Sequence, residues 1–159
     1  MFGLSDMPSF FVALLIVLPL VALVHQLGHI FFAWLFGGKV SFILGRGRTL
    51  LKIGFLEIKT VYFIDSFCHY EDLAVDNKLT HSLVYAGGVI FNIVSVFILN
   101  SIILAGYLDP KMYFYQYAYF SVYYAFFAVL PIQYGENHPS DGKALYDVIK
   151  YGTRCDLID

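Results

Sequence analysis

Three long apolar segments constrain the fold of this chain more than any other feature of its sequence. They cover about residues 9–36, 81–108 and 112–132, and each has the ~20 residues that a helix needs to cross a bilayer. Apolar residues make up 59% of the chain and charged residues 14%, against about 45–50% and about 25% in soluble proteins. Because a soluble domain could not bury this much apolar surface, we expect an all-α membrane protein with a core of three transmembrane helices. Residues 1–159 are expected to form one domain.

The first apolar segment is typical of a retained transmembrane helix rather than a signal peptide. No Lys or Arg precedes it, its apolar run is longer than the hydrophobic part of a signal peptide, and no clean small-x-small cleavage site follows it. We therefore count it as part of the membrane core.

The basic residues predict how the chain crosses the membrane. Six lie between the first two segments (Lys39, Arg46, Arg48, Lys52, Lys59 and Lys78), three follow the third (Lys143, Lys150 and Arg154), and one lies between the second and third (Lys111). The positive-inside rule then places the first connection and the C-terminus in the cytoplasm and the N-terminus outside. We expect a multi-pass protein of a prokaryotic cell membrane. The net charge of -2 and the lack of a basic stripe argue against nucleic acid as a partner.

The first connection is expected to contain a small β element. Two apolar runs flank the turn-rich Gly45-Arg46-Gly47-Arg48, and residues 56–62 alternate between apolar and polar side chains. We predict two or three short strands at the membrane surface, over about residues 40–62. Residues 66–78 are polar and acidic, and we expect an exposed linker there.

Two histidines inside the first apolar segment point to a metal. His25 and His29 are four residues apart, so on a helix their imidazoles share one face. Neutral imidazoles suit zinc, and ionisable residues within lipid usually have a function. The alternative is that each histidine is satisfied separately in the interior of the bundle.

A third ligand must come from another part of the chain. Asp141, which precedes an amphipathic stretch over residues 144–149, is the candidate that we favour; it could instead cap that helix. His138 and Glu136 are the other candidates.

Gln26 follows the first histidine of the pair. Zinc proteases with this pattern have Glu there, which takes a proton from the attacking water and passes it to the leaving amine. An amide has a similar shape and forms hydrogen bonds, but it cannot take up that proton. Asn92, in the second segment, is expected to face the bundle interior or the backbone of a substrate.

Together these motifs resemble the site-2 protease family of intramembrane zinc metalloproteases. His25 and His29 match the family's His-Glu-x-x-His, with Gln26 departing from it, and Asp141-Gly142 matches its Asp-Gly motif. Residues 88–92, Gly-Val-Ile-Phe-Asn, resemble its Gly-Pro-x-x-Asn, with Val in place of Pro, and Leu130-Pro131-Ile132 resembles its proline-containing segment. The stretch over residues 133–140 is longer than in the family motif.

The resemblance implies one zinc ion held by His25, His29 and Asp141, with Gln26 at the general-base position. It also implies hydrolysis of a peptide bond in a transmembrane or membrane-associated peptide, with strands near residues 40–62 holding an extended substrate. Gln26 is then either an engineered change that inactivates the enzyme or the mark of a natural pseudoprotease that binds membrane peptides without cutting them. A membrane metal transporter or sensor is a third hypothesis. It would need a second polar array, whereas the second and third segments offer little beyond Asn92, Asn100 and Gln116. Substrate and oligomeric state stay open.

Overall fold

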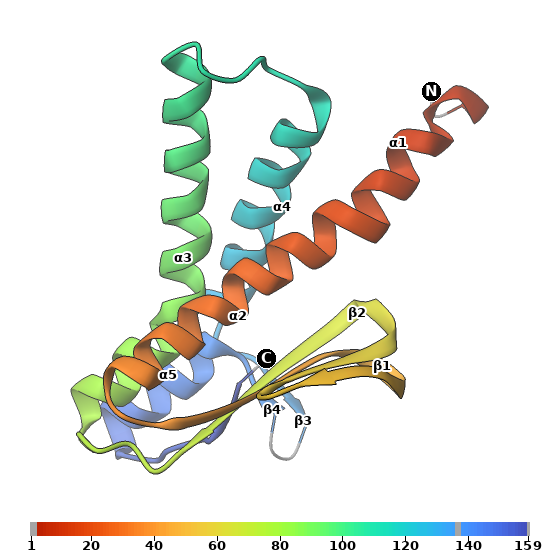
Figure 1. The fold of residues 1–159 in the computed structure, drawn as a ribbon. Coiled ribbons are helices and arrows are strands. Elements are labelled where there is room, and N and C mark those ends of the chain that lie inside the picture. Colours follow the sequence, from red (N-terminus) through yellow and green to blue (C-terminus); the bar gives the residue numbers. More distant parts are fainter. Residues whose placement is uncertain (1–2, 136–137, 159) are drawn as a thin grey trace.

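A computed structural model describes residues 3–135 and 138–158 of the chain. Its elements, in chain order, are η1 (Leu4–Asp6), α1 (Met7–Val12), η2 (Ala13–Val17), α2 (Leu18–Leu35), β1 (Lys39–Ile53), β2 (Leu56–Glu71), α3 (Lys78–Leu104), α4 (Met112–Val129), β3 (Gln133–Gly135), β4 (His138–Pro139), α5 (Asp141–Tyr151) and β5 (Leu157–Ile158). Figure 1 shows the helices grouped above a long β-hairpin, with α5 beside the lower end of α3.

The first four elements form one continuous helical rod from Leu4 to Leu35. Ala13–Val17 is a π-helical turn that comes just before Pro19, a residue near the start of α2. Because proline has no backbone N–H, the helix loses one hydrogen bond there, and a wider turn is a common way to accommodate the loss. In Figure 1 this rod is strongly tilted and passes over the hairpin.

Two helices are long and apolar enough to cross a membrane, among the residues described: Leu4–Leu35 and Lys78–Leu104. They correspond to the first two predicted segments, although α3 ends at Leu104 rather than at residue 108. The third predicted segment corresponds to α4, which is not such a helix because its many tyrosines and Gln116 make it less apolar.

The prediction of an all-α protein with a three-helix core was therefore wrong. The structure is mixed, 58% helical and 24% strand, with two antiparallel sheets. The strands β1 and β2 have 15 and 16 residues, far longer than the short strands expected over residues 40–62. Residues 66–71, predicted as linker, belong to β2, where Ser66, Cys68 and Tyr70 are buried on alternate positions. That alternation is the signature of a half-buried strand, and the polar side chains concealed it.

The first sheet has the strand order β1-β2-β5, and β3 and β4 form the second. Residues 42–44 pair with two parts of β2, residues 66–68 and residues 56–58. The hairpin thus folds back on itself. Gly45 and Gly47 both have positive φ, a conformation that glycine adopts without strain, and they lie where the chain leaves the inner strand.

The helices α2 and α3 pack through glycine. A Cβ on Gly28 would lie 2.1 Å from the carbonyl oxygen of Gly87, so the two backbones are in direct contact. Small residues permit such close approach between membrane helices. The contact fixes how α2 faces α3.

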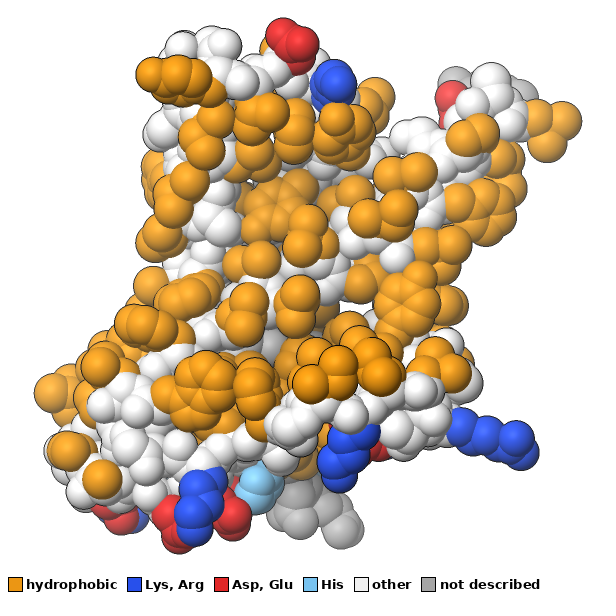
Figure 2. All heavy atoms as spheres, viewed as in Figure 1, with side chains coloured by type: hydrophobic (Ala, Val, Ile, Leu, Met, Phe, Trp, Pro, Cys, Tyr) orange, Lys and Arg blue, Asp and Glu red, His pale blue; other side chains and the backbone are white. Residues whose placement is uncertain are grey.

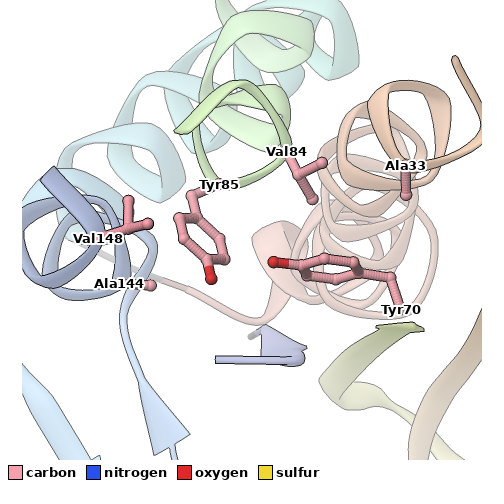
Figure 3. Packing of buried hydrophobic residues seen from close by; sticks show 6 residues of the cluster. All are labelled: Ala33, Tyr70, Val84, Tyr85, Ala144 and Val148. Atoms are coloured by element: carbon pink, nitrogen blue, oxygen red, sulfur yellow. The ribbon is translucent and has the colours of Figure 1, made fainter. Parts of the chain in front are cut away.

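A buried cluster joins this helix pair to the sheet and to α5. Figure 3 shows its six residues, which are Ala33, Tyr70, Val84, Tyr85, Ala144 and Val148. They come from α2, β2, α3 and α5, and the rings of Tyr70 and Tyr85 meet edge to face with centroids 6.2 Å apart. The C-terminal helix is therefore anchored against the first helix pair.

Apolar side chains dominate the outer surface of the helices. Figure 2 shows them as a broad band, with charged side chains gathered at the two ends of the molecule. Many large apolar residues are more than half exposed, among them Ile16, Phe97, Tyr119 and Phe126. A patch of this size on one monomer marks a surface that contacts something other than water.

Candidate metal centre

Three side chains converge in the interior, where α2 meets the start of α5. Nε2 of His25 lies 2.9 Å from Oδ2 of Asp141, and Nε2 of His29 lies 3.4 Å from the same oxygen. All three residues are buried, and their ligand atoms lie within 4.8 Å of one another. The helical spacing thus predicted the shared face correctly, and the structure brings Asp141 to it.

The spacing of these atoms suits a tetrahedral metal. Ligands at about 2.0–2.1 Å from a zinc ion lie about 3.3 Å from one another, close to the two distances found here. Apart from these contacts with one another, neither Nε2 atom nor either Asp141 oxygen has a hydrogen-bond partner among the described residues. Buried polar atoms are normally paired, so a cation shared by these three residues fits the site.

The other ring nitrogen of each histidine has a partner. Nδ1 of His29 lies 2.7 Å from the carbonyl oxygen of Val84, which can only accept, so Nδ1 carries a proton and Nε2 is the nitrogen available to a metal. Nδ1 of His25 lies 3.3 Å from the amide of Asn92. The nearer amide atom is Nδ2 of Asn92; with a metal at Nε2 of His25, the amide would turn over so that its oxygen accepts the Nδ1 proton. Asn92, predicted to face the interior or a substrate, therefore lies buried behind a ligand.

Gly88 makes room for both imidazoles. A Cβ at this position would lie 2.4 Å from Nε2 of His25 and 2.5 Å from Nε2 of His29. Any larger residue would occupy the place where the ligand atoms meet.

Asp141 is the first residue of α5, and Ser140 is its N-cap. The Ser140 hydroxyl accepts a hydrogen bond from the Lys143 N–H at 3.2 Å and donates to the carbonyl oxygen of Leu130. The alternative in which Asp141 caps the helix is thus not what the structure has. The carboxylate is left to point at the histidines, with the positive end of α5 behind it.

Burial disfavours the charged form of Asp141, but positive charge on His29 and His25 outweighs it and lowers the pKa of this carboxyl. A bound cation would take the place of the histidine protons. The site is built to hold a positive charge beside this carboxylate.

Of the two other candidate ligands, only His138 belongs to the described residues, and it is not a member of this cluster. The ring of His138 packs against Phe67, with centroids 5.8 Å apart, and Glu136 lies outside the described residues.

Gln26 is buried next to the histidines and faces β2. Its Nε2 donates to the Ser66 hydroxyl at 3.0 Å and to the Ser66 carbonyl oxygen at 3.3 Å. Its Oε1 has no partner among the described residues. Nothing in the sequence pointed to Ser66, because the contact joins residues 40 positions apart through a strand that was predicted as a linker.

Two cavities reach Asp141 from different sides. One of about 410 Å³ has an apolar lining that includes Val89, Ile90, Leu145 and Ile149. The other, of about 230 Å³, is lined by tyrosines of α4 together with Tyr134 and Ser140. Asp141 thus lines both cavities, although all three residues of the centre are buried.

Comparison with known proteins supplies the family. No protein-family model matches the chain, and no solved structure matches it. A protein of Bacillus subtilis (strain 168), the "Uncharacterized membrane protein YwmF", is 51% identical over 157 residues, which is 99% of each chain. The chain belongs to the YwmF family. As in that relative's name, it is a membrane protein, in agreement with its two long apolar helices.

Proposed function

We propose that this member of the YwmF family is an intramembrane zinc protein of the site-2 protease type, in which Gln26 holds back peptide hydrolysis. The observation that carries the proposal is the convergence of His25, His29 and Asp141 on one point. Among the described residues, the atoms that meet there have no hydrogen-bond partner outside the cluster. The motif order along the chain supports it.

A zinc ion held by these residues would polarise the scissile carbonyl and make a water molecule acidic enough to attack it. The protein's own groups would orient the ligands and move the proton. Asn92 and the Val84 carbonyl keep both imidazoles in the orientation that ligation needs. A carboxylate at position 26 would take the proton from water and return it to the leaving amine. The Gln26 amide can orient the water but cannot move its proton, and losing a general base costs ~10²–10⁴ in rate.

The substrate class proposed is a transmembrane or membrane-associated peptide. A helical substrate hides its peptide bonds, so the segment to be cut must be extended, and its exposed backbone groups need partners. The edge of the sheet that packs on α2 can supply them by strand addition. The apolar cavity beside Asp141 would accept an apolar side chain of such a peptide.

A natural pseudoprotease that binds peptides without cutting them is the second candidate. The Gln26–Ser66 contact favours it, because the amide donates to a backbone carbonyl oxygen, which a carboxylate cannot do. The surroundings of position 26 thus suit an amide. A transporter has no comparable support, because it would need further metal-binding groups along a pathway through the membrane. In the described part of the chain, one group of three potential ligands converges.

We also propose a multi-pass arrangement in a prokaryotic cell membrane, with the N-terminus outside and the C-terminus in the cytoplasm. In Figure 1 the N-terminus and the α3–α4 connection lie at one end, and the hairpin and C-terminus at the other. Most of the basic residues belong to the hairpin and the C-terminal part, which favours the cytoplasm for that end.

The experiment that tests the function compares the wild-type protein with its Gln26→Glu variant, measuring zinc content and cleavage of model membrane peptides in purified samples. We expect about one zinc in both proteins and cleavage by the Gln26→Glu variant alone. His29→Ala added to the Gln26→Glu variant removes a ligand and is the matched control; this double variant should lose both zinc and cleavage. Zinc in both proteins with cleavage by neither would favour the pseudoprotease. Loss of zinc from both would exclude the metal centre.

A further inference from the structure

A short C-terminal strand lies on the sheet beside the metal centre. Strand β5 pairs antiparallel with β2, with Ile158 opposite Cys68 and Leu157 opposite His69. Ser66, which holds the Gln26 amide, is two residues along β2 from Cys68. The chain's own C-terminal segment therefore occupies the β2 edge next to the site.

The backbone pattern identifies which groups of β2 face this edge. The Tyr70 N–H donates to the carbonyl oxygen of Asp156 at 3.0 Å. Since backbone groups alternate in direction along a strand, Cys68 and Ser66 point to the same side as Tyr70. The Ser66 carbonyl is the next acceptor in this row, and Gln26 donates to it. The Gln26 amide thus takes the hydrogen bond that a longer β5, or another strand, would make.

The other edge of β1 is not open to a further strand beside the metal centre. Residues 42–44 already pair with residues 56–58, and the Phe42 N–H donates to the Phe55 carbonyl oxygen at 2.7 Å. An extended peptide that adds a strand beside the centre must therefore use the β2 edge, where β5 lies.

Strand β5 is paired only weakly with this edge of β2. Two residues form the strand, and the segment before it is tied by the Tyr85 hydroxyl to the backbone of Cys155 and by an Arg154–Asp76 ion pair. A two-residue ladder is easily displaced, whereas its tether keeps it at high effective concentration. These are the properties of an internal competitor.

We propose that residues 156–158 act as an autoinhibitory strand, which covers the β2 edge beside the metal centre and must be displaced by an extended peptide. This inference rests on the proposed function, since it assigns the β2 edge to the peptide on which the centre would act. The peptide would pair with Cys68 and Tyr70 in place of β5 and with the Ser66 carbonyl in place of the Gln26 amide.

The first test frees the edge in the full-length protein. Ile158→Pro removes an N–H that faces Cys68, whereas the N–H of Leu157 faces away from β2, so Leu157→Pro is the matched control. The probe is a fluorescein-labelled peptide of residues 153–158 carrying Cys155→Ser, and its binding is followed by anisotropy. We expect about ten-fold tighter binding to the Ile158→Pro protein than to wild type, and wild-type binding for the control. Equal binding by all three proteins would overturn the proposal.

The second test locks the edge and does not depend on how the first variant folds. His69 and Leu157 form a non-hydrogen-bonded pair, whose short separation suits a disulfide. His69→Cys with Leu157→Cys, in a background of Cys68→Ala and Cys155→Ser, should bind the probe about ten-fold more weakly when oxidised than when reduced. Unchanged binding would contradict autoinhibition.

Zinc content, measured in the same samples, separates the two proposals. Normal zinc with no response of peptide binding to lock or release overturns the autoinhibitory strand alone. A zinc-free wild type whose peptide binding still responds overturns the metal centre and supports β5 as the occupant of the edge.

Discussion

Gly88 lies so close to His25 that a Cβ at position 88 would sit 2.4 Å from the imidazole Nε2. Gly88→Ala should therefore reduce zinc affinity by about ten-fold or more while the protein still folds, because the methyl group displaces ligand atoms rather than helix backbone. Metal analysis together with circular dichroism measures both effects.

The neighbouring glycine provides the contrast. Gly87→Ala places its methyl group 2.5 Å from the Gly28 carbonyl oxygen, so it should separate α2 from α3 and lower the unfolding temperature. If Gly88→Ala bound zinc as tightly as wild type, the assignment of Nε2 of His25 as a ligand would be wrong.

Asn92→Ala should weaken zinc binding by about 10–100-fold, the usual cost of removing the partner that orients a histidine ligand. The measurement is a competition titration with a zinc chelator dye. Asn100→Ala is the control, because that amide lies exposed on the same helix, and its zinc affinity should equal that of wild type. A substrate contact alone at Asn92 would leave zinc affinity unchanged.

Gln26→Glu should destabilise the metal-free protein by about 1–3 kcal/mol, because the Ser66 carbonyl loses its donor and faces another acceptor. Ser66→Ala removes only the hydroxyl acceptor, so its effect should be smaller. Unfolding in denaturant, with detergent held constant, compares the three proteins. Equal stability of wild type and the Gln26→Glu variant would remove the support for a site adapted to an amide.

The stability of the metal-free protein should depend on acid through Asp141. Its folded-state pKa is lowered, so the carboxylate stabilises the fold fully above about pH 4, the ordinary pKa of Asp. That contribution is lost as the pH falls through the lower folded-state value. Unfolding temperatures measured between pH 5 and pH 2, in chelator, should fall for wild type and change less for Asp141→Asn. Parallel curves would mean that no positive charge faces this carboxylate.

The two cysteines should react very differently with a maleimide. Burial raises the pKa of the Cys68 thiol to about 12, and the side chain has no exposed surface, whereas Cys155 is partly exposed. At pH 7.5 we expect mass spectrometry to find one label, on Cys155, and two after denaturation. Early labelling of Cys68 would show that the sheet opens next to the metal centre.

Helical periodicity was enough to predict the pairing of His25 with His29, since the spacing alone sets a shared face. The order of motifs along the chain predicted that Asp141 would lie beside the two histidines. The sequence left open whether Asp141 caps its helix, and the structure has Ser140 in that role. The sheet was predicted poorly, because Ser66 and Cys68 are buried polar or small residues that lack the hydrophobic alternation of an ordinary strand. The third segment was also wrongly predicted as apolar enough to span a membrane. Tyrosine counts as apolar in the composition, yet its hydroxyl makes it less hydrophobic than phenylalanine. The pairing of β5 with β2 joins distant segments and has no local signal.

The three ligand atoms belong to parts of the chain that are synthesised far apart. His25 and His29 are held by a helix pair whose backbones touch at Gly28 and Gly87, while Asp141 arrives on a separate C-terminal helix. A metal ion shared by them would close a very long loop of the chain. The free energy of metal binding would then stabilise the packing of that helix. Metal supply would then decide whether the last portion of the newly made protein settles against the first.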